Sequence, residues 1–164
     1  MVETYTIPRG DRGIFRTVAK MRELVAQGVT EPLPVETAAF IVAPYCCGAE
    51  RAQAIREFLL SHIVFTPDPQ GIELLKTPAY LLEQVHTDGF AFGDCDDVAT
   101  LGATLGKAVG FPARFVLLGF QPRAPFSHVF TELATPQGWA ELDTTAPAQF
   151  PGSLQVHKQK TVEV

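Results

Sequence analysis

Three residues in the second half of the chain could together form a thiol-based catalytic centre. Cys95 lies in the stretch GDCDD, His128 follows in FSHVF, and Asp143 ends GWAELD. In such a centre a thiolate attacks, an imidazole takes and returns the proton, and a carboxylate orients the imidazole. The order Cys, His, Asp therefore predicts acyl transfer or hydrolysis at an amide carbonyl.

The immediate neighbours of Cys95 oppose this chemistry, because Asp94, Asp96 and Asp97 are carboxylates that disfavour a thiolate. A helix that begins at Cys95 would act in the other direction, since free N–H groups at a helix start lower the pKa of a thiol. An imidazolium at His128 would favour the thiolate further. We therefore expect the aspartates to be first-turn partners of a helix, each worth about 0.3 to 1 kcal/mol, and the thiol to react well below pH 8.

The apolar spacing predicts the elements that must position these residues. Helices are predicted over 11–27, about 35–45, 49–64, 77–85 and from 95 to about 110, with Thr77 as an N-cap. The TEPLP segment at 30–34 is interpreted as a linker because its two prolines would interrupt a helix. Three glycines from 102 to 110 predict close packing of the last helix against a neighbour.

The residue pattern changes after the last predicted helix. ARFVLLGF, SHVFTEL and GWAELD are short β-branched and aromatic runs between turns, which predicts consecutive antiparallel strands. Alternation places His128 on one face with Phe126 and Phe130, half buried, so its ring needs a partner such as Asp143. Helices followed by strands predict one α+β domain over 1–164, helical over about 10–92, with a catalytic core over about 93–145.

Composition limits the classes of partner. A net charge of -5 over 164 residues provides no broad basic surface, so we expect no nucleic-acid partner. No apolar run is long enough to span a bilayer, so we expect no membrane association and a soluble, cytoplasmic protein. Three cysteines, of which Cys46 and Cys47 are adjacent, form no disulfide framework; we expect these two to be buried at a helix end.

The same residues resemble a known family. The run from Gly93 to Thr145 is similar to the transglutaminase-like superfamily of papain-type cysteine enzymes. The shared motifs are a glycine-x-cysteine that opens the core helix, a GFPAR turn at 110–114, a histidine on the next strand, and an aspartate after GW. The resemblance implies the papain-like fold, with Cys95 as nucleophile, His128 as base and Asp143 as orienter.

Segments upstream of Gly93, such as AIREFLLSHIVFTPDP and ELLKTPAYLLEQ, resemble small stand-alone members found in bacteriophages and prophages. This narrower resemblance implies possible incorporation into a phage particle, with virion assembly partners.

Supporting roles are open at several positions. The resemblance implies the Cys95 backbone N–H as one oxyanion donor, and Gln84 or His86 are candidates for a second, although surface roles at a helix end are more ordinary. Trp139 is expected to pack in the core near Asp143, or to shield its bond to the histidine.

Two further readings concern charged groups. Arg114 is expected in a structural ion pair. A metal site formed by Cys95, Asp97 and His128 lacks a recognised ligand spacing, so neither a metal nor a cofactor is expected.

Three functions follow from these observations. The favoured one is a cysteine peptidase or amidase acting on a peptide or protein, possibly glutamine-containing or derived from the cell wall. The second is a cross-linking transglutaminase that passes the same acyl group to an amine. The third is a non-enzymatic structural or assembly module of a phage or prophage particle.

Overall fold

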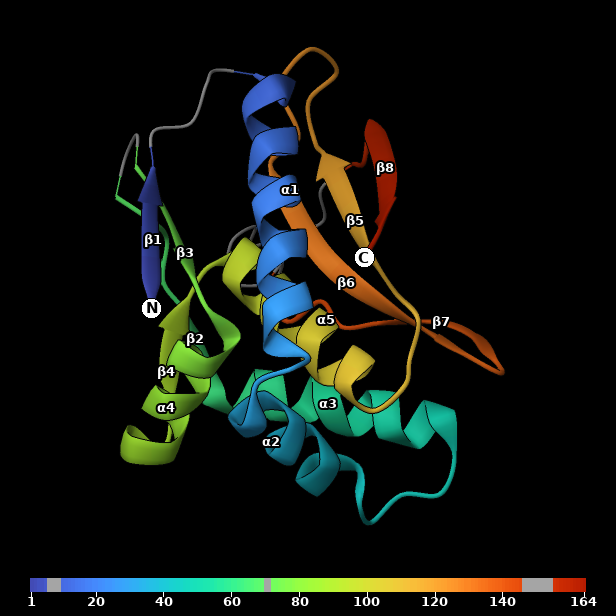
Figure 1. The fold of residues 1–164 in the computed structure, drawn as a ribbon. Helices are drawn as coiled ribbons and strands as arrows, with labels where there is room; N and C mark the ends of the chain where they lie inside the picture. Colours follow the sequence, from blue (N-terminus) through green and yellow to red (C-terminus); the bar gives the residue numbers. More distant parts are fainter. Residues whose placement is uncertain (6–9, 70–71, 146–154) are drawn as a thin grey trace.

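Helices and short strands pack around one central helix in the computed structural model, which describes residues 1–5, 10–69, 72–145 and 155–164. That central helix is α5, Cys95–Ala108, and a four-stranded sheet covers one side of it (Figure 1). The remaining helices lie on its other sides; they are α1 (Asp11–Gly28), α2 (Pro32–Val42), α3 (Gly48–His62) and α4 (Pro78–Asp88).

The predicted helices are confirmed, with one correction. Thr77 caps α4, because its hydroxyl accepts a hydrogen bond from the Tyr80 N–H at 3.3 Å. The segment at 30–34 is not a linker, since α2 already begins at Pro32. A proline at the first helical position lacks an N–H that would have no partner there, and its fixed φ suits the helix.

The large sheet is antiparallel, in the order β7-β6-β5-β8. Its strands are β5 (Ala113–Gly119), β6 (His128–Thr135), β7 (Gly138–Glu141) and β8 (Lys158–Glu163). The first three confirm the predicted antiparallel strands and the α+β class. The fourth, β8, was not predicted, because KQKTVE is polar and mostly exposed at the sheet edge.

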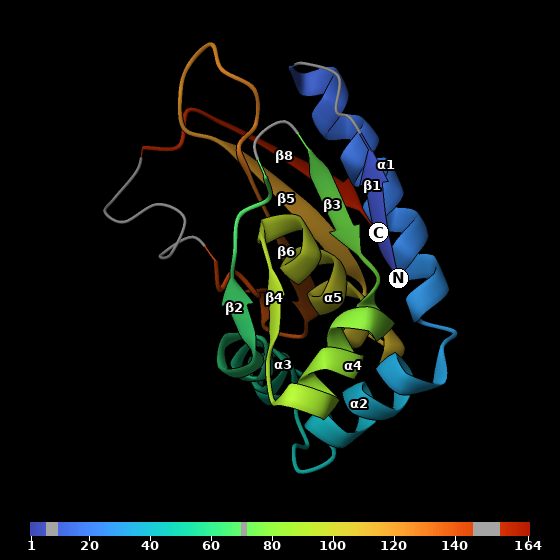
Figure 2. The same cartoon turned by 90° about the vertical axis from the view of Figure 1, so that its left-hand side faces the viewer.

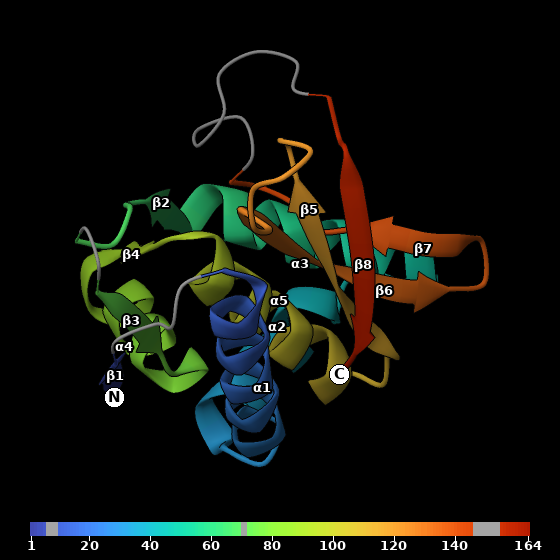
Figure 3. The same cartoon turned by 90° about the horizontal axis from the view of Figure 1, so that it is seen from above.

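Two small strand pairs lie on the opposite side of α5 from the large sheet (Figure 3). Strand β1 (Val2–Tyr5) pairs antiparallel with β3 (Glu73–Lys76) (Figure 2). Strand β2 (Ile63–Phe65) pairs in parallel with β4 (Ala91–Gly93), which leads directly into α5. The small pairs therefore deliver the chain to the start of the central helix.

Close packing holds α5 along β6. The Thr131 hydroxyl donates a hydrogen bond to the Ala99 carbonyl at 2.6 Å. A Cβ added at Gly102 would lie 3.2 Å from a Leu59 methyl, and one at Gly106 would lie 2.3 Å from a Leu133 methyl. The glycine prediction is thus confirmed at these two positions.

Gly110 differs from the other two glycines. Its φ is 93° and a Cβ there would meet nothing within 4 Å, so its role is to turn the chain after α5.

The two adjacent cysteines correct another expectation, because Cys46 and Cys47 are exposed. The Cys47 sulfur accepts a hydrogen bond from the Glu50 N–H at 3.4 Å and caps α3. A cap must satisfy a free N–H at the helix start, which here lies at the surface.

None of the helices in the described part of the chain combines the length and apolar character that crossing a bilayer requires.

Candidate active site

Cys95 is the first residue of α5, as predicted, and its sulfur contacts the neighbouring sheet. The Val129 backbone N–H, in β6, donates a hydrogen bond to the sulfur. Val129 directly follows His128 in the chain. The start of the central helix therefore meets β6 at the predicted histidine.

His128 and Asp143 are bonded to one another. His128 Nε2 lies 2.7 Å from Asp143 Oδ2, and both residues are buried. Asp143 Oδ1 accepts a further hydrogen bond from the Thr145 N–H at 3.0 Å. The histidine is 3% exposed rather than half buried, because the rings of Phe120 and Phe130 flank it at 6.3 and 6.0 Å between centroids.

A cavity of about 170 Å³ joins the thiol to the imidazole. Cys95, His128 and Val129 line it, whereas Asp143 lies behind the imidazole and does not. Apolar side chains of α1 form part of its wall, with Ile14 and Met21 among them. The arrangement thus places a sulfur and an imidazole, backed by a carboxylate, on one small cavity.

The electrostatics of the thiol differ from the expectation. Burial and the charge of Asp94 raise the pKa of the Cys95 thiol, and Glu73 and Asp143 add to this. The Val129 N–H lowers the pKa but does not reverse the balance. The pKa of the Cys95 thiol is therefore above its ordinary value, because the partly buried sulfur lies beside carboxylates rather than at an open helix end.

Asp96 and Asp97 lie in the first turn of α5, as predicted. Asp94 occupies the N-cap position, yet its side chain makes no capping hydrogen bond. Asp96 and Asp97 are both buried. They are buried because β3 and the cavity cover this end of α5, as the Lys76 contacts of Asp97 show.

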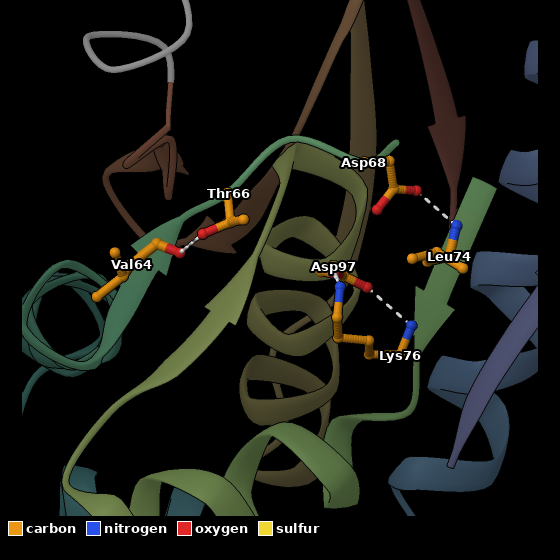
Figure 4. A network of polar contacts seen from close by, with 6 residues as sticks. All are labelled: Val64, Thr66, Asp68, Leu74, Lys76 and Asp97. Carbon is orange, nitrogen blue, oxygen red and sulfur yellow. Dashed lines mark hydrogen bonds and ion pairs between the residues drawn. The ribbon is translucent and has the colours of Figure 1, made fainter. Parts of the chain in front are cut away.

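Asp97 links α5 to β3 (Figure 4). Its Oδ1 accepts from the Lys76 backbone N–H at 2.8 Å, and its Oδ2 pairs with the Lys76 ammonium. Burial and the charge of Asp94 raise the pKa of Asp97 to about 7, against the opposing effect of Lys76. Nearby, Asp68 accepts from the Leu74 N–H, and burial raises the pKa of Asp68 to about 6.

A metal site at the start of α5 would use carboxylate oxygens that are already bonded. Carboxylate atoms of Asp94, Asp96 and Asp97 lie within 4.8 Å of one another. Both oxygens of Asp97 are, however, bonded to Lys76. A metal held by the alternative ligand set of Cys95, Asp97 and His128 would have to break that ion pair.

The lower-ranked candidates lie elsewhere. Gln84 is half-buried and His86 exposed on α4, and neither is among the residues that line the cavity. Trp139 is not in the core: it is 41% exposed, and the Arg114 guanidinium stacks 3.8 Å from its ring centre. Arg114 also pairs with Glu132 at 2.6 Å, which confirms its predicted structural role.

Several site residues carry no local sequence signal. Thr17 and Glu73 line the cavity from α1 and β3, Lys76 neutralises Asp97, and Thr145 bonds Asp143. The first three depend on contacts between distant segments. Only Thr145, two residues after Asp143, could have been found from sequence, as a neighbour able to orient that carboxylate.

Two solved structures share this arrangement of elements. One is described as a "putative protease" from Parabacteroides distasonis, with a TM-score of 0.64 and 15% identity, over 95% of this chain and 30% of that one. The other is described as a "putative cysteine protease" from Cytophaga hutchinsonii, with a TM-score of 0.52 and 15% identity, over 79% of this chain and 50% of that one. The chain therefore spans half or less of each.

At such identities the two structures show the fold alone. No curated protein matches the chain in sequence. A family model does match: the one described as "Transglutaminase-like superfamily" covers residues 36–144, which includes α5, β5, β6 and the predicted triad. By this match over most of its length, the chain belongs to the transglutaminase-like superfamily.

Proposed function

We propose that the protein is a cysteine-dependent hydrolase of amide bonds in peptides, with Cys95 as nucleophile, His128 as general base and acid, and Asp143 as the residue that orients His128. One observation carries this proposal: Cys95 and His128 line the same cavity, and Asp143 Oδ2 lies 2.7 Å from His128 Nε2. The solved structures of similar fold are described as putative proteases, which supports a peptide or protein substrate.

The bond to Asp143 determines which imidazole nitrogen would exchange the proton. Because Nε2 donates to the Asp143 carboxylate, proton transfer with the sulfur would use Nδ1. The thiol proton moves to Nδ1 while the Cys95 sulfur attacks the carbonyl carbon, so a C–S bond forms and the carbonyl oxygen becomes negative. His128 then gives the proton to the amide nitrogen as the C–N bond breaks, which leaves a thioester on Cys95.

Water completes the cycle. His128 takes a proton from the water as it attacks the thioester, and returns it to the sulfur as the C–S bond breaks, so a carboxylic acid and the thiol are released. The backbone N–H of Cys95, at the start of α5, would stabilise the oxyanion in both steps. An amine in place of water would give the cross-linking reaction of a transglutaminase.

The experiment is to trap the acyl-enzyme. The Cys46→Ala/Cys47→Ala double variant removes the two exposed cysteines, so any thioester detected by mass spectrometry must lie on Cys95. Peptides that contain glutamine and fragments of cell-wall peptide serve as acyl donors. We expect a thioester whose formation falls by about 10² to 10⁴ in His128→Ala, while thermal unfolding reports whether the variant is folded.

The outcomes separate the three functions. A trapped thioester that decays in water supports the hydrolase, and faster decay with added amine than with water would favour the cross-linking enzyme. No thioester with any donor in the folded protein would refute the proposal and favour the assembly module.

A further inference from the structure

The cavity beside Cys95 has two chemically different walls. One wall is apolar and includes Ile14, Val18 and Met21 of α1. The other carries three carboxyl groups, which belong to Glu73, Asp94 and Asp96. A catalytic thiol does not need this acidic wall, and the wall raises the pKa of the thiol through Asp94 and Glu73.

The charge of the acidic wall is not balanced within the described ranges. Lys76, a cation at this end of α5, already pairs with Asp97. Asp96 is 6% exposed, and its carboxyl bonds the side chains of Asp94 and Glu73, which are acids themselves. Burial and these neighbours raise the pKa of Asp96 well above its usual value. The proximity of these carboxyl groups thus disfavours the ionised form of Asp96.

Polar atoms around the cavity are also without partners. Asp94 Oδ1 and Asp96 Oδ1 are buried and find no hydrogen-bond donor in the part of the chain that the structure describes. Independently, the Thr17 hydroxyl of α1 is buried without a partner among the same residues, and Thr17 is 5% exposed and lines the same cavity. Buried acceptors without donors are costly, which points to a ligand that supplies N–H groups.

A primary ammonium group fits these acceptors best. It carries three N–H donors, no acceptor and a positive charge. A divalent metal fits less well, because Lys76 occupies both oxygens of Asp97 and one wall is apolar. The cavity of about 170 Å³ is close to the size of one that holds a benzene molecule. It therefore accommodates about one amino-acid residue.

The position of the acids relative to the nucleophile narrows the choice further. Asp94 and Asp96 flank Cys95 in the chain, so a charge held by them lies close to the attacked carbon. In a peptide only the α-ammonium group of the first residue is two bonds from a carbonyl carbon. A lysine side chain would place its charge several bonds further away.

We infer that the cavity binds the amino-terminal residue of a peptide, with its α-ammonium group held by Asp94, Asp96 and Glu73 and by the Thr17 hydroxyl, so that Cys95 releases that residue. This inference rests on the proposed function and names its substrate class. The C–N bond after the first residue breaks, the shortened peptide leaves with its new amine protonated by His128, and water releases the amino acid from the thioester.

The experiment compares two substrates that differ only in the charge. Alanyl-p-nitroanilide carries the free ammonium group, and its Nα-acetylated counterpart does not. We expect kcat/KM for the free amine to exceed that for the acetylated compound by about thirtyfold or more, as for other charges that bind a buried partner. Equal rates for the two compounds would overturn the inference.

Variants locate the recognition. Asp96→Asn and Thr17→Val should each lower the ratio of kcat/KM for the free amine to kcat/KM for the acetylated compound. Glu36→Gln removes one exposed carboxylate on α2, far from any assigned role, and serves as the matched control with unchanged discrimination. A loss of discrimination in Glu36→Gln equal to that in Asp96→Asn would show that only net charge matters, and would overturn the inference.

Two further measurements keep the test independent of folding and of the proposed function. Cys95→Ala leaves the acidic wall intact, so calorimetry should detect trialanine but not N-acetyltrialanine; binding of both or of neither would count against the inference. p-Nitrophenyl acetate carries no ammonium group. If it acylates Cys95 in a His128-dependent manner while the two anilides react equally, the hydrolase stands and the inference fails. If it does not acylate Cys95, both fail.

Discussion

The contact between Gly106 of α5 and Leu133 of β6 fixes the helix that carries the proposed nucleophile, Cys95, against the strand that begins with His128. Gly106→Ala would place a Cβ 2.3, 2.7 and 3.1 Å from three side-chain atoms of Leu133. Carbon atoms in contact normally lie about 3.5 to 4.0 Å apart. Leu133 is completely buried, so it has no open space into which it could turn. The substitution must therefore move α5 and β6 apart by about 1 Å.

The free energy of unfolding follows from two opposing effects. Overpacking of a core costs about 1 to 3 kcal/mol, and three short contacts place this site at the upper end. Replacing a helical glycine by alanine returns about 1 kcal/mol. We therefore expect a net loss of about 2 kcal/mol for Gly106→Ala. Activity should fall further, by about a hundredfold, because a shift of 1 Å separates Cys95 from His128.

The assay is urea denaturation of a double-mutant cycle with Leu133→Ala, together with the rate of Cys95 acylation. Leu133→Ala alone should cost about 2 to 5 kcal/mol, but about 1 to 2 kcal/mol less when Gly106→Ala already fills part of the space. Gly102→Ala, whose Cβ would meet its nearest atoms at 3.2 and 3.3 Å, is the graded control and should cost less. A Gly106→Ala protein as stable and active as wild type would refute this account of the packing.

Other expectations concern charges and rings near the site. Lys76→Met should destabilise the protein by about 3 kcal/mol at pH 8, when Asp97 is ionised and loses its only described counter-charge, and by less at pH 5. In wild type, urea titrations should show the free energy of unfolding decreasing as the pH rises from about 4 to 7. Folding raises the pKa of Asp97 to about 7, so the folded state binds more protons than the unfolded state over this range. Thr145→Val removes only a long 3.4 Å bond to Asp143, so acylation should slow by about twofold. Trp139→Ala should lower the free energy of unfolding by about 0.5 to 1 kcal/mol, because the cation–π contact with Arg114 is lost, and it should leave the rate of acylation unchanged. A large loss of acylation would show that Trp139 does act in the active site.

The elements that carry the predicted triad could be identified from sequence because their signals are local. An apolar helix pattern begins at Cys95, and β5 to β7 are β-branched runs separated by turns. Strands β1 to β4 have three or four residues each, too few for a period to emerge. The pairing of β1 with β3 joins segments about 70 residues apart in the chain, for which local sequence provides no evidence.

The same distinction explains the errors at the site. The expectation for Asp94, Asp96 and Asp97 used only their place in a first helical turn, where carboxylates at the surface are ordinary. The burial of Asp96 and Asp97 depends on β3, which supplies Lys76 and Glu73 from elsewhere in the chain. Trp139 misled for a related reason: a large aromatic residue is usually buried, but β7 is an edge strand and its ring is covered by Arg114 instead.

If the acidic wall beside the proposed nucleophile binds an ammonium group, the charge of the substrate affects both its binding and the reactivity of the thiol. Before substrate arrives, Asp94 and Glu73 help to hold the thiol protonated and weakly reactive. A bound ammonium group would offset those charges and so favour the thiolate. A substrate without the charge would then be disfavoured twice, in binding and again in thiolate formation, and the two factors multiply in kcat/KM. The pH dependence of Cys95 alkylation by iodoacetamide tests this coupling: saturating alanine amide should shift the reaction to lower pH, and N-acetylalanine amide should not. The same shift with both amides, or no shift with either, would contradict this coupling between ammonium binding and thiolate formation.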